Sequence, residues 1–317
     1  MNRTSKTAGY LLTIAGGLLW AIGGSFGQQI FQLNHATSNW LVPIRLFIAG
    51  ALILAVAYGK NRGQIMDVWR NKKDVRDLLL FTLLGAGASQ YTYYTCIQYS
   101  NAAFATVISY MFPAIILVYQ VIRQRRPPRG YELAAVLLVT VGAITCTTQW
   151  NLDAMKVAPI AVIVGLFSAA ASAYNTVKPQ RLLKKYSLLS IIGWSMLLSG
   201  VVYALICRPW QTPVLVNGRL IWMMAVVIIG GTIFAFCCFQ AGVRIVGSLA
   251  GSVLASVEPV GAVLIAFLFL KVPLTAMDLF GFFLILVTIP LIALGQRREE
   301  AMGPAGELVS TSSHEAS

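Results

Sequence analysis

Residues 236–268 read FCCFQAGVRIVGSLAGSVLASVEPVGAVLIAFL, and residues 90–122 read QYTYYTCIQYSNAAFATVISYMFPAIILVYQVI. A shift of 146 places Pro113 on Pro259, and polar positions elsewhere in the two stretches also correspond. This correspondence indicates an internal repeat, although apolar helices also align loosely with one another. Because the apolar runs are long enough to cross a bilayer, the pattern favours a membrane protein built from two similar units.

Composition supports the same class. The chain has 317 residues, of which 57% are apolar and only 11% are charged. A soluble domain averages about 45–50% apolar and about 25% charged residues. The shortage of charge excludes an ordinary soluble domain, a disordered chain and a disulfide-rich secreted module. We therefore predict an all-α integral membrane protein.

Ten stretches are apolar over the roughly 20 residues that a spanning helix needs. They lie at 9–31, 38–59, 77–98, 102–122, 132–149, 157–177, 187–207, 220–242, 248–270 and 275–295. Each unit then holds five transmembrane helices, an odd number, so the second unit is inverted relative to the first. We predict a cytoplasmic N-terminus at 1–8, a first repeat at 9–149, a second repeat at 150–295 and a disordered cytoplasmic tail at 296–317.

The distribution of positive charge predicts the orientation. Of the 24 lysines and arginines, nineteen lie in the N-terminus, the tail and alternate loops, four lie in the remaining loops, and Arg45 lies inside a span. Such asymmetry places the positive loops in the cytoplasm. We expect a multi-pass plasma-membrane protein with both termini cytoplasmic. Nucleic acid is not an expected partner, because no basic face with interleaved aromatic residues lies outside the spans.

Uncharged polar and aromatic side chains recur at helical spacing on the first, third, fourth, sixth, eighth and ninth spans. Hydrogen-bonding groups beside aromatic rings suit a small amphipathic solute. Serine, threonine and glycine also serve as contacts between membrane helices, which is the alternative for those residues. The predicted cavity residues are Gln90, Tyr94, Gln240 and Asn175 as hydrogen-bonding groups, with Trp20, Tyr110 and Phe236 as apolar walls.

Arg45 and Glu258 are the charged residues that lie well within spans. Ionisable groups at such positions are functional candidates. For Glu258 three roles stay open: structural or gating hydrogen bonds, proton coupling, and contact with a cationic solute. On an ideal helix Glu258 points with Gly251, which favours a helix–helix seam. Arg45 is expected to pair with Glu258 or to reach the outer interface. Arg45, Pro113 and Pro259 are also candidate proton-coupling or gating positions, and a proline removes a backbone donor.

We predict no cofactor and no metal site. The five cysteines lie in or beside apolar runs, and Cys237 and Cys238 are adjacent, without the two-residue gap of a zinc or redox pair. His35 and His314 lie apart from other ligand types. The same scarcity of catalytic groups predicts that the protein is not an enzyme.

With these motifs in view, the chain resembles the EamA-domain branch of the drug/metabolite transporter superfamily over about residues 9–295. The residues that carry the resemblance are Trp20 in the first span, Arg45 in the second, the stretch from Asn101-Ala102-Ala103 to Pro113, and Ala255-Ser-Val-Glu258-Pro259. The resemblance implies a ten-helix inner-membrane carrier made of two inverted units. Characterised members mostly move amino acids, drugs or other metabolites, many of them outward.

The chain departs from the family pattern at one place in each repeat. A Gly-Glu pair often follows the fourth and ninth helices in such proteins, but here those places read Arg123-Gln-Arg125-Arg126 and Leu270-Lys271-Val272. No role of that glutamate is therefore carried over.

The expected function is secondary active transport of a small organic metabolite by alternating access, as an exporter coupled to protons. The expected partners are the solute, protons and the lipid bilayer. An uncoupled exchanger or uniporter is the first alternative. A membrane sensor or enzyme without transport is the second, and it predicts catalytic side chains clustered at one membrane face.

Overall fold

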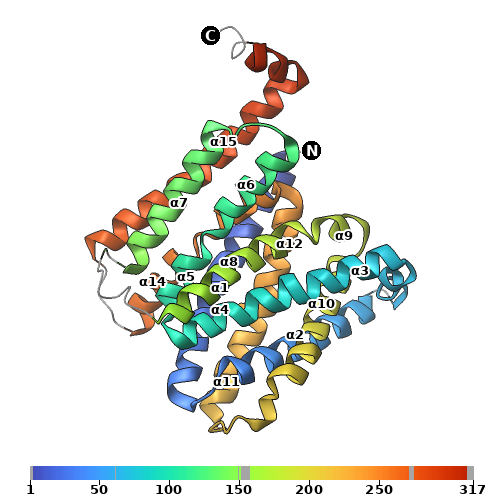
Figure 1. Cartoon of the computed structure of the whole chain (residues 1–317), viewed down its shortest axis with the longest axis vertical. Coiled ribbons are helices and arrows are strands. Elements are labelled where there is room, and N and C mark those ends of the chain that lie inside the picture. The colour runs from blue at the N-terminus through green and yellow to red at the C-terminus, as the bar shows by residue number, and fades with distance from the viewer. Residues whose placement is uncertain (1–2, 61, 149, 151–157, 271–274, 313–317) are drawn as a thin grey trace.

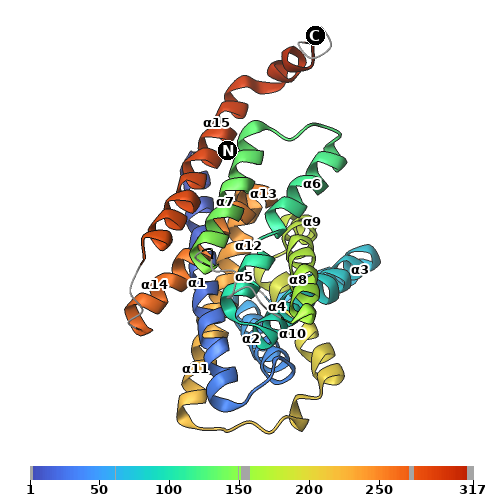
Figure 2. The same ribbon diagram turned by 60° about the vertical axis from the view of Figure 1, so that its left-hand side comes forward.

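The computed structural model describes residues 3–60, 62–148, 150, 158–270 and 275–312, and that part of the chain holds helices and no strand (Figures 1 and 2). The first half contains α1 (Arg3–Asn34), α2 (Ser38–Lys60), α3 (Lys72–Leu80), η3 (Phe81–Gly87), α4 (Ala88–Tyr99), α5 (Ala102–Ser109), α6 (Phe112–Gln124) and α7 (Gly130–Thr148). The second half contains α8 (Pro159–Val177), α9 (Gln180–Lys185), α10 (Leu188–Cys207), α11 (Gly218–Ile228), η6 (Ile229–Phe234), α12 (Ala235–Val246), α13 (Ser248–Ala255), α14 (Glu258–Leu270) and α15 (Ala276–Ser312). Short 3₁₀ turns lie at Arg62–Gln64, Asp67–Arg70 and Pro209–Gln211.

Within the described residues, eight helical stretches are long and apolar enough to cross a membrane. A further apolar helix, Gly130–Cys146, is shorter. The predicted span 77–98 is helical but is not among the eight, and it is rich in tyrosine, threonine and glutamine. The chain is therefore a multi-pass membrane protein, and the number of ten spanning helices stays a prediction.

The two halves are inverted relative to each other. The helices α2 and α10 hold the same place in each half and pack together along their length. Gly50 of α2 lies against Leu197, and Gly200 of α10 lies against Phe47, so the two helices run antiparallel. Counterpart helices of opposite direction are what an odd number of helices per unit requires.

The same relation holds for the helices on either side. The helix α1 packs along α12, and α8, the counterpart of α1, packs along α4, the counterpart of α12. Gly23 of α1 lies against Gly231 of η6, the segment that leads into α12, and Gly85 of η3, the segment that leads into α4, lies against Asn175 of α8. Small residues at these crossings allow close backbone approach, which stabilises helix pairs in lipid.

Both halves interrupt their helices at corresponding places. The segments η3 and η6 are π-helical and begin 148 residues apart. The fourth predicted span breaks between α5 and α6 at Tyr110, and the ninth breaks between α13 and α14 at Ser256, 146 residues later. Pro113 and Pro259 each lie in the first turn after the break, where a missing backbone N–H is tolerated.

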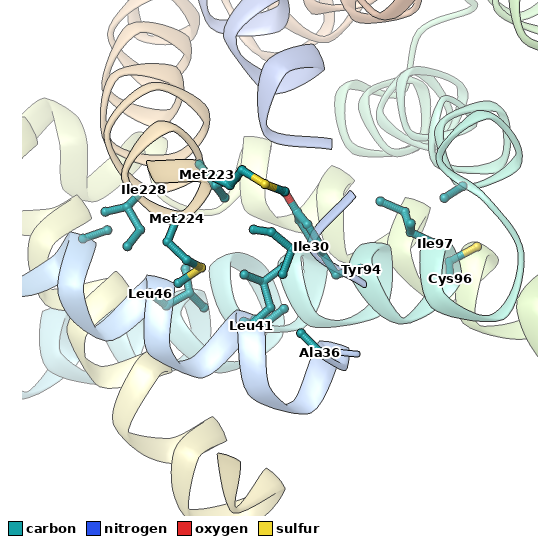
Figure 3. Close-up of a cluster of buried hydrophobic side chains, with 14 of the residues drawn as sticks. Ile30, Ala36, Leu41, Leu46, Tyr94, Cys96, Ile97, Met223, Met224 and Ile228 are labelled. Carbon is teal, nitrogen blue, oxygen red and sulfur yellow. The ribbon is translucent and has the colours of Figure 1, made fainter. Parts of the chain in front are cut away.

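Apolar side chains fill the space between the helices and also cover the outside. Met223, Met224 and Ile228 of α11 pack in one buried cluster with Leu41 and Leu46 of α2 (Figure 3). Many large apolar side chains point outward as well, and some are more than 60% exposed: Leu11, Ile122, Leu205 and Phe283 are examples. An apolar exterior of this kind suits lipid as the surrounding solvent.

The first turns of α1 and the last turns of α15 lie toward the same end of the molecule (Figures 1 and 2). The helix α15 continues beyond the apolar stretch to Ser312, so the described part of the tail that the sequence predicts as disordered from residue 296 is helical. Arg297, Arg298 and Glu299 are good helix formers, so local propensity does not end the helix there.

Gly50→Ala tests the antiparallel crossing of α2 and α10. A Cβ at this position overlaps the backbone of Leu197, whereas a Cβ on Gly59 of the same helix meets nothing within 4 Å. We expect Gly50→Ala to lower the free energy of unfolding by about 1–3 kcal/mol because the crossing is overpacked. Thermal denaturation of the detergent-solubilised protein measures the effect. Equal melting temperatures for Gly50→Ala and the control Gly59→Ala would contradict the crossing.

Candidate functional site

A cavity of about 630 Å³, counting space open to solvent, lies between the two halves. Its lining comes from α1, α4, α5, α6, α8, η6, α12 and α14. The lining residues are Trp20, Ser89, Gln90, Tyr93, Tyr94, Thr106, Ser109, Tyr110, Phe112, Ser172, Asn175, Thr176, Gly231, Phe239 and Glu258. Five of the seven cavity residues expected from the sequence are in this set: Trp20, Gln90, Tyr94, Tyr110 and Asn175.

Glu258 is the carboxylate in this lining. The hydroxyl of Tyr93 donates to its Oε1 at 3.2 Å, and the hydroxyl of Tyr110 lies 2.9 Å from its Oε2. The Tyr110 hydroxyl also lies 3.1 Å from the carbonyl oxygen of Ala255, so its single proton serves either acceptor. Thr106 extends the network through a 3.0 Å contact with Tyr93. The Glu258 side chain is only 9% exposed, and each of its oxygens lies within hydrogen-bond distance of a tyrosine hydroxyl.

The break before α14 explains why Glu258 lines the cavity. An ideal helix through this region places Glu258 on the face of Gly251 and predicts a seam. The regular helix instead ends at Ala255 and starts again at Glu258. The direction of a side chain in α14 therefore no longer follows from the helical period of α13. Gly251 packs against Val243 of α12, as a seam residue does, while Glu258 turns toward the tyrosines.

Arg45 lies behind the cavity wall and is 1% exposed. Its guanidinium donates to the Tyr94 hydroxyl at 3.0 Å, to Thr232 Oγ1 at 3.4 Å and to Gln90 Oε1. The guanidinium carbon also lies 4.1 Å from the centre of the Tyr94 ring. Neither expectation from the sequence holds: among the described residues Arg45 makes no ion pair with Glu258, and it does not reach the outer interface.

The consequence of this arrangement is that Arg45 orients two cavity side chains. Tyr94 receives a hydrogen bond from Arg45 and donates its own to the carbonyl oxygen of Gly23 at 2.9 Å, so it is fixed between α2 and α1. Gln90 lies one turn earlier on the same face of α4. A planar guanidinium with several donors suits this task, because it serves both side chains at once.

Gln240 and Phe236 do not line the cavity. Gln240 is fully buried, donates to the carbonyl oxygen of Asn175 at 3.0 Å and accepts from Gln180 at 3.1 Å. Phe236 packs edge-on against Trp20, with ring centres 5.3 Å apart. The π-helical turns of η6 rotate the residues that follow around the helix axis, so Phe239 faces the cavity instead.

Two buried polar atoms of the lining have no hydrogen-bond partner in the described part of the chain. They are Nε1 of Trp20, a donor, and Oδ1 of Asn175, an acceptor. Buried polar groups are normally hydrogen-bonded, so an unpaired polar atom in a cavity wall is a candidate contact for a ligand or a water molecule.

Tyr93 and Phe239 line the cavity but are not among the residues predicted from the sequence. The signal in the sequence for Tyr93 is its place one turn after Gln90.

The architecture and the cavity define a class. Two inverted helical units around a polar cavity with an intramembrane carboxylate are characteristic of a membrane transporter. A family model described as the EamA-like transporter family matches residues 7–148 and 159–294. The chain belongs to this family, and its cargo is therefore of the small-molecule class.

Individual relatives agree with the family. The uncharacterized inner membrane transporter YicL of Salmonella typhimurium (strain LT2) is 31% identical over 298 residues, which are 94% of this chain and 98% of the relative. A protein of known crystal structure aligns with 92% of this chain and 98% of its own, with a TM-score of 0.77 and 16% identity. The latter likeness shows the fold alone.

Tyr110→Phe tests the break before α14. The variant removes the donor shared by Glu258 and the Ala255 carbonyl, and leaving buried acceptors unpaired costs about 1–3 kcal/mol. We expect a clear drop in melting temperature. Tyr119→Phe is the matched control, because this hydroxyl accepts a hydrogen bond from the exposed Arg123 at 2.6 Å and lies on an exposed side chain outside the network. A drop of the same size in both variants would show that the network around Glu258 has no special role.

Proposed function

We propose that the protein is a secondary active transporter that moves a small organic metabolite across the plasma membrane by alternating access, exporting it in exchange for protons. The observation that carries the proposal is the cavity between two inverted halves with Glu258 in its wall. Alternating access follows when the halves rock against each other around a fixed central site. No catalytic step is needed for this cycle.

Recognition of the solute involves the two orphan atoms. Trp20 Nε1 donates a hydrogen bond to an acceptor on the solute, and Asn175 Oδ1 accepts one from a donor. The rings of Tyr94, Phe239 and Trp20 provide apolar contacts around them. A solute of this kind carries at least one acceptor and one donor on a compact, partly apolar body. Gln90, oriented by Arg45, adds a further amide.

In the proposed coupling of solute and proton transport, Glu258 is the group that binds the proton. A carboxyl group in a cavity holds either a proton or the donor group of a solute, and it does not hold both at once. Competition of this kind links the two flows in opposite directions, so a proton that enters replaces a solute that leaves. Tyr93 and Tyr110 keep the carboxyl group in place in both conditions.

Ten spanning helices, cytoplasmic termini and a gating role for Pro113 and Pro259 belong to the same proposal. The start of α1 and the end of α15, which lie toward the same end of the molecule, and the excess of lysine and arginine in alternate loops support the orientation. The helix breaks beside both prolines provide places where the helices around the cavity bend without losing further backbone hydrogen bonds.

One observation favours a second candidate function. Both oxygens of Glu258 already have tyrosine donors, which is also what a purely positioning carboxylate requires. In that case the protein is an uncoupled exchanger or uniporter of the same solute class.

An untargeted metabolite comparison identifies the solute. Cells with and without the protein are compared for extracellular compounds, and we expect a reproducible increase of one compound when the protein is present. Purified protein in proteoliposomes then exchanges that compound across the bilayer. An unchanged extracellular profile together with no exchange in proteoliposomes would contradict the transport function.

Glu258→Gln separates the two candidate functions. The amide keeps the size of the side chain but does not carry the proton, so we expect loss of solute-driven proton flux with solute binding retained. Asp67→Asn, at a partly exposed aspartate outside the cavity lining, is the control. Proton flux that persists in Glu258→Gln excludes coupling through this residue, and absence of flux in the unmodified protein favours the uncoupled carrier.

Trp20→Phe tests recognition of the solute. The variant keeps an aromatic ring but loses the Nε1 donor, and we expect the half-saturation concentration of the identified solute to rise by about tenfold, as for a lost buried hydrogen bond. Trp210→Phe, at an exposed position in the turn Pro209–Gln211, is the control. Equal half-saturation values in both variants would remove Trp20 from the binding site.

A further inference from the structure

A cluster of ion pairs joins the two repeats beside the start of α3. Asp74 of α3 carries a carboxylate side chain and is nevertheless only 2% exposed. It receives hydrogen bonds from Lys185 Nζ at 2.5 Å and Tyr186 Oη at 2.7 Å, and a further one from Arg181. Asp74 lies in the first repeat, whereas all three partners lie in or beside α9 of the second repeat.

Asp77 adds a second carboxylate one turn later. Its Oδ1 lies 2.9 Å from Lys178 Nζ, and its Oδ2 lies 3.1 Å from Arg181. Lys178 follows Thr176, a cavity residue, by less than one helical turn. The cluster therefore joins the repeats at the edge of the cavity.

The carboxylates depend on the cations for their burial. The hydrogen bond from Lys185 lowers the pKa of Asp74 below its ordinary value, against the opposing effect of burial. Asp74 is thus charged at neutral pH, and a buried charge is stable only while it is paired. Arg181 and Lys185 are more than half exposed, so water reaches the cluster from outside and separation of the repeats solvates every member.

The opposite end of the repeats is joined differently. Trp222 of α11 lies 148 residues after Asp74, the spacing that relates the π-helical segments, and its ring packs edge-on against Phe26 at 5.4 Å. Asn34 also donates to the carbonyl oxygen of Leu215 at 2.8 Å. Among the described residues, no ion pair joins the repeats at that end. The two ends therefore differ in chemistry although the backbones are related by symmetry.

We propose that the cluster of Asp74 and Asp77 with Lys178, Arg181 and Lys185 is an ionic gate that closes the cavity toward the cytoplasm. This inference rests on the proposed transport function, because alternating access requires a contact between the halves that forms in one state and breaks in the other. The gate at the opposite end is neutral. Salt and charge substitutions therefore shift the balance between the two states in one direction, toward opening on the cytoplasmic side.

Cysteine accessibility tests the gate without knowledge of the solute. Ser172→Cys, on the background with the five native cysteines replaced, places a reporter in the cavity. Membrane vesicles that expose the cytoplasmic face are treated with MTSET, a cationic impermeant thiol reagent, and separately with the anionic reagent MTSES. We expect Asp74→Asn with Asp77→Asn to accelerate labelling by both reagents by about tenfold.

Two comparisons isolate the effect of opening. A change in local potential accelerates one reagent and slows the other, whereas opening accelerates both. Raising the salt from about 0.05 M to about 0.5 M shortens the screening length, and it should accelerate labelling of the reporter protein but not of the double variant. Lys184→Gln, at an exposed lysine of α9 outside the cluster, should leave the labelling rate unchanged.

A cross-link provides the converse test and does not remove both carboxylates. Asp74→Cys with Lys185→Cys, bridged by a short bifunctional thiol reagent, should slow subsequent labelling of the reporter from the cytoplasmic face. Labelling that is unaffected by the cross-link, or equal rates with and without the carboxylates, would overturn the gate and leave the transport function standing. A reporter that reacts from neither face under any condition would instead contradict the proposed function.

Discussion

A backbone within lipid must satisfy its hydrogen bonds internally, and the cavity exists because the protein breaks two helices and still meets this requirement. The break between α13 and α14 leaves the Ala255 carbonyl available, and Tyr110, which lies at the corresponding break in the other repeat, supplies a donor. The same hydroxyl reaches Glu258. One tyrosine at one interruption therefore supplies a proton that either the other interruption or the carboxylate beside it accepts, and the arrangement of the cavity depends on this contact.

The helices divide into two groups that differ in the regularity of the helix. The crossings of α2 with α10 and of α7 with α15 are tight, with glycines such as Gly50, Gly200 and Gly142 against the facing helix. The π-helical segments and the breaks all lie in the helices that surround the cavity. The symmetry of the backbone is not kept by the side chains, because Phe112 of the first repeat stands where the second has Glu258. The second repeat therefore supplies a carboxyl group to the site and the first repeat supplies an aromatic ring at the same position, as coupling through one carboxyl group requires.

Periodicity in the sequence predicts much of this arrangement, and tertiary contacts determine the rest. The inverted repeat, the paired prolines and cavity residues such as Gln90, Tyr94 and Asn175 follow from helical spacing and polarity. The direction of the Glu258 side chain is not predictable from an ideal helix, because an ideal helix does not contain the break. The prediction that Gln240 lines the cavity is wrong because the π-helical turns before it rotate the helix face. The hydrogen-bond partners of Arg45 come from two other helical segments, α4 and η6. Lys178, Arg181 and Lys185 were counted only as orientation signals, because the burial of Asp74 and Asp77 is not visible in the sequence.

The central claim is that Glu258 lies in a cavity that opens to each side of the membrane in turn. Glu258→Cys, on the background with the native cysteines replaced, tests this claim through its reaction with an impermeant thiol reagent added to either face alone. The account predicts reaction from each face, since each state exposes the cavity on one side. Absence of reaction from both faces, in a variant that keeps its melting temperature, would place residue 258 in a closed helix–helix seam and contradict the account.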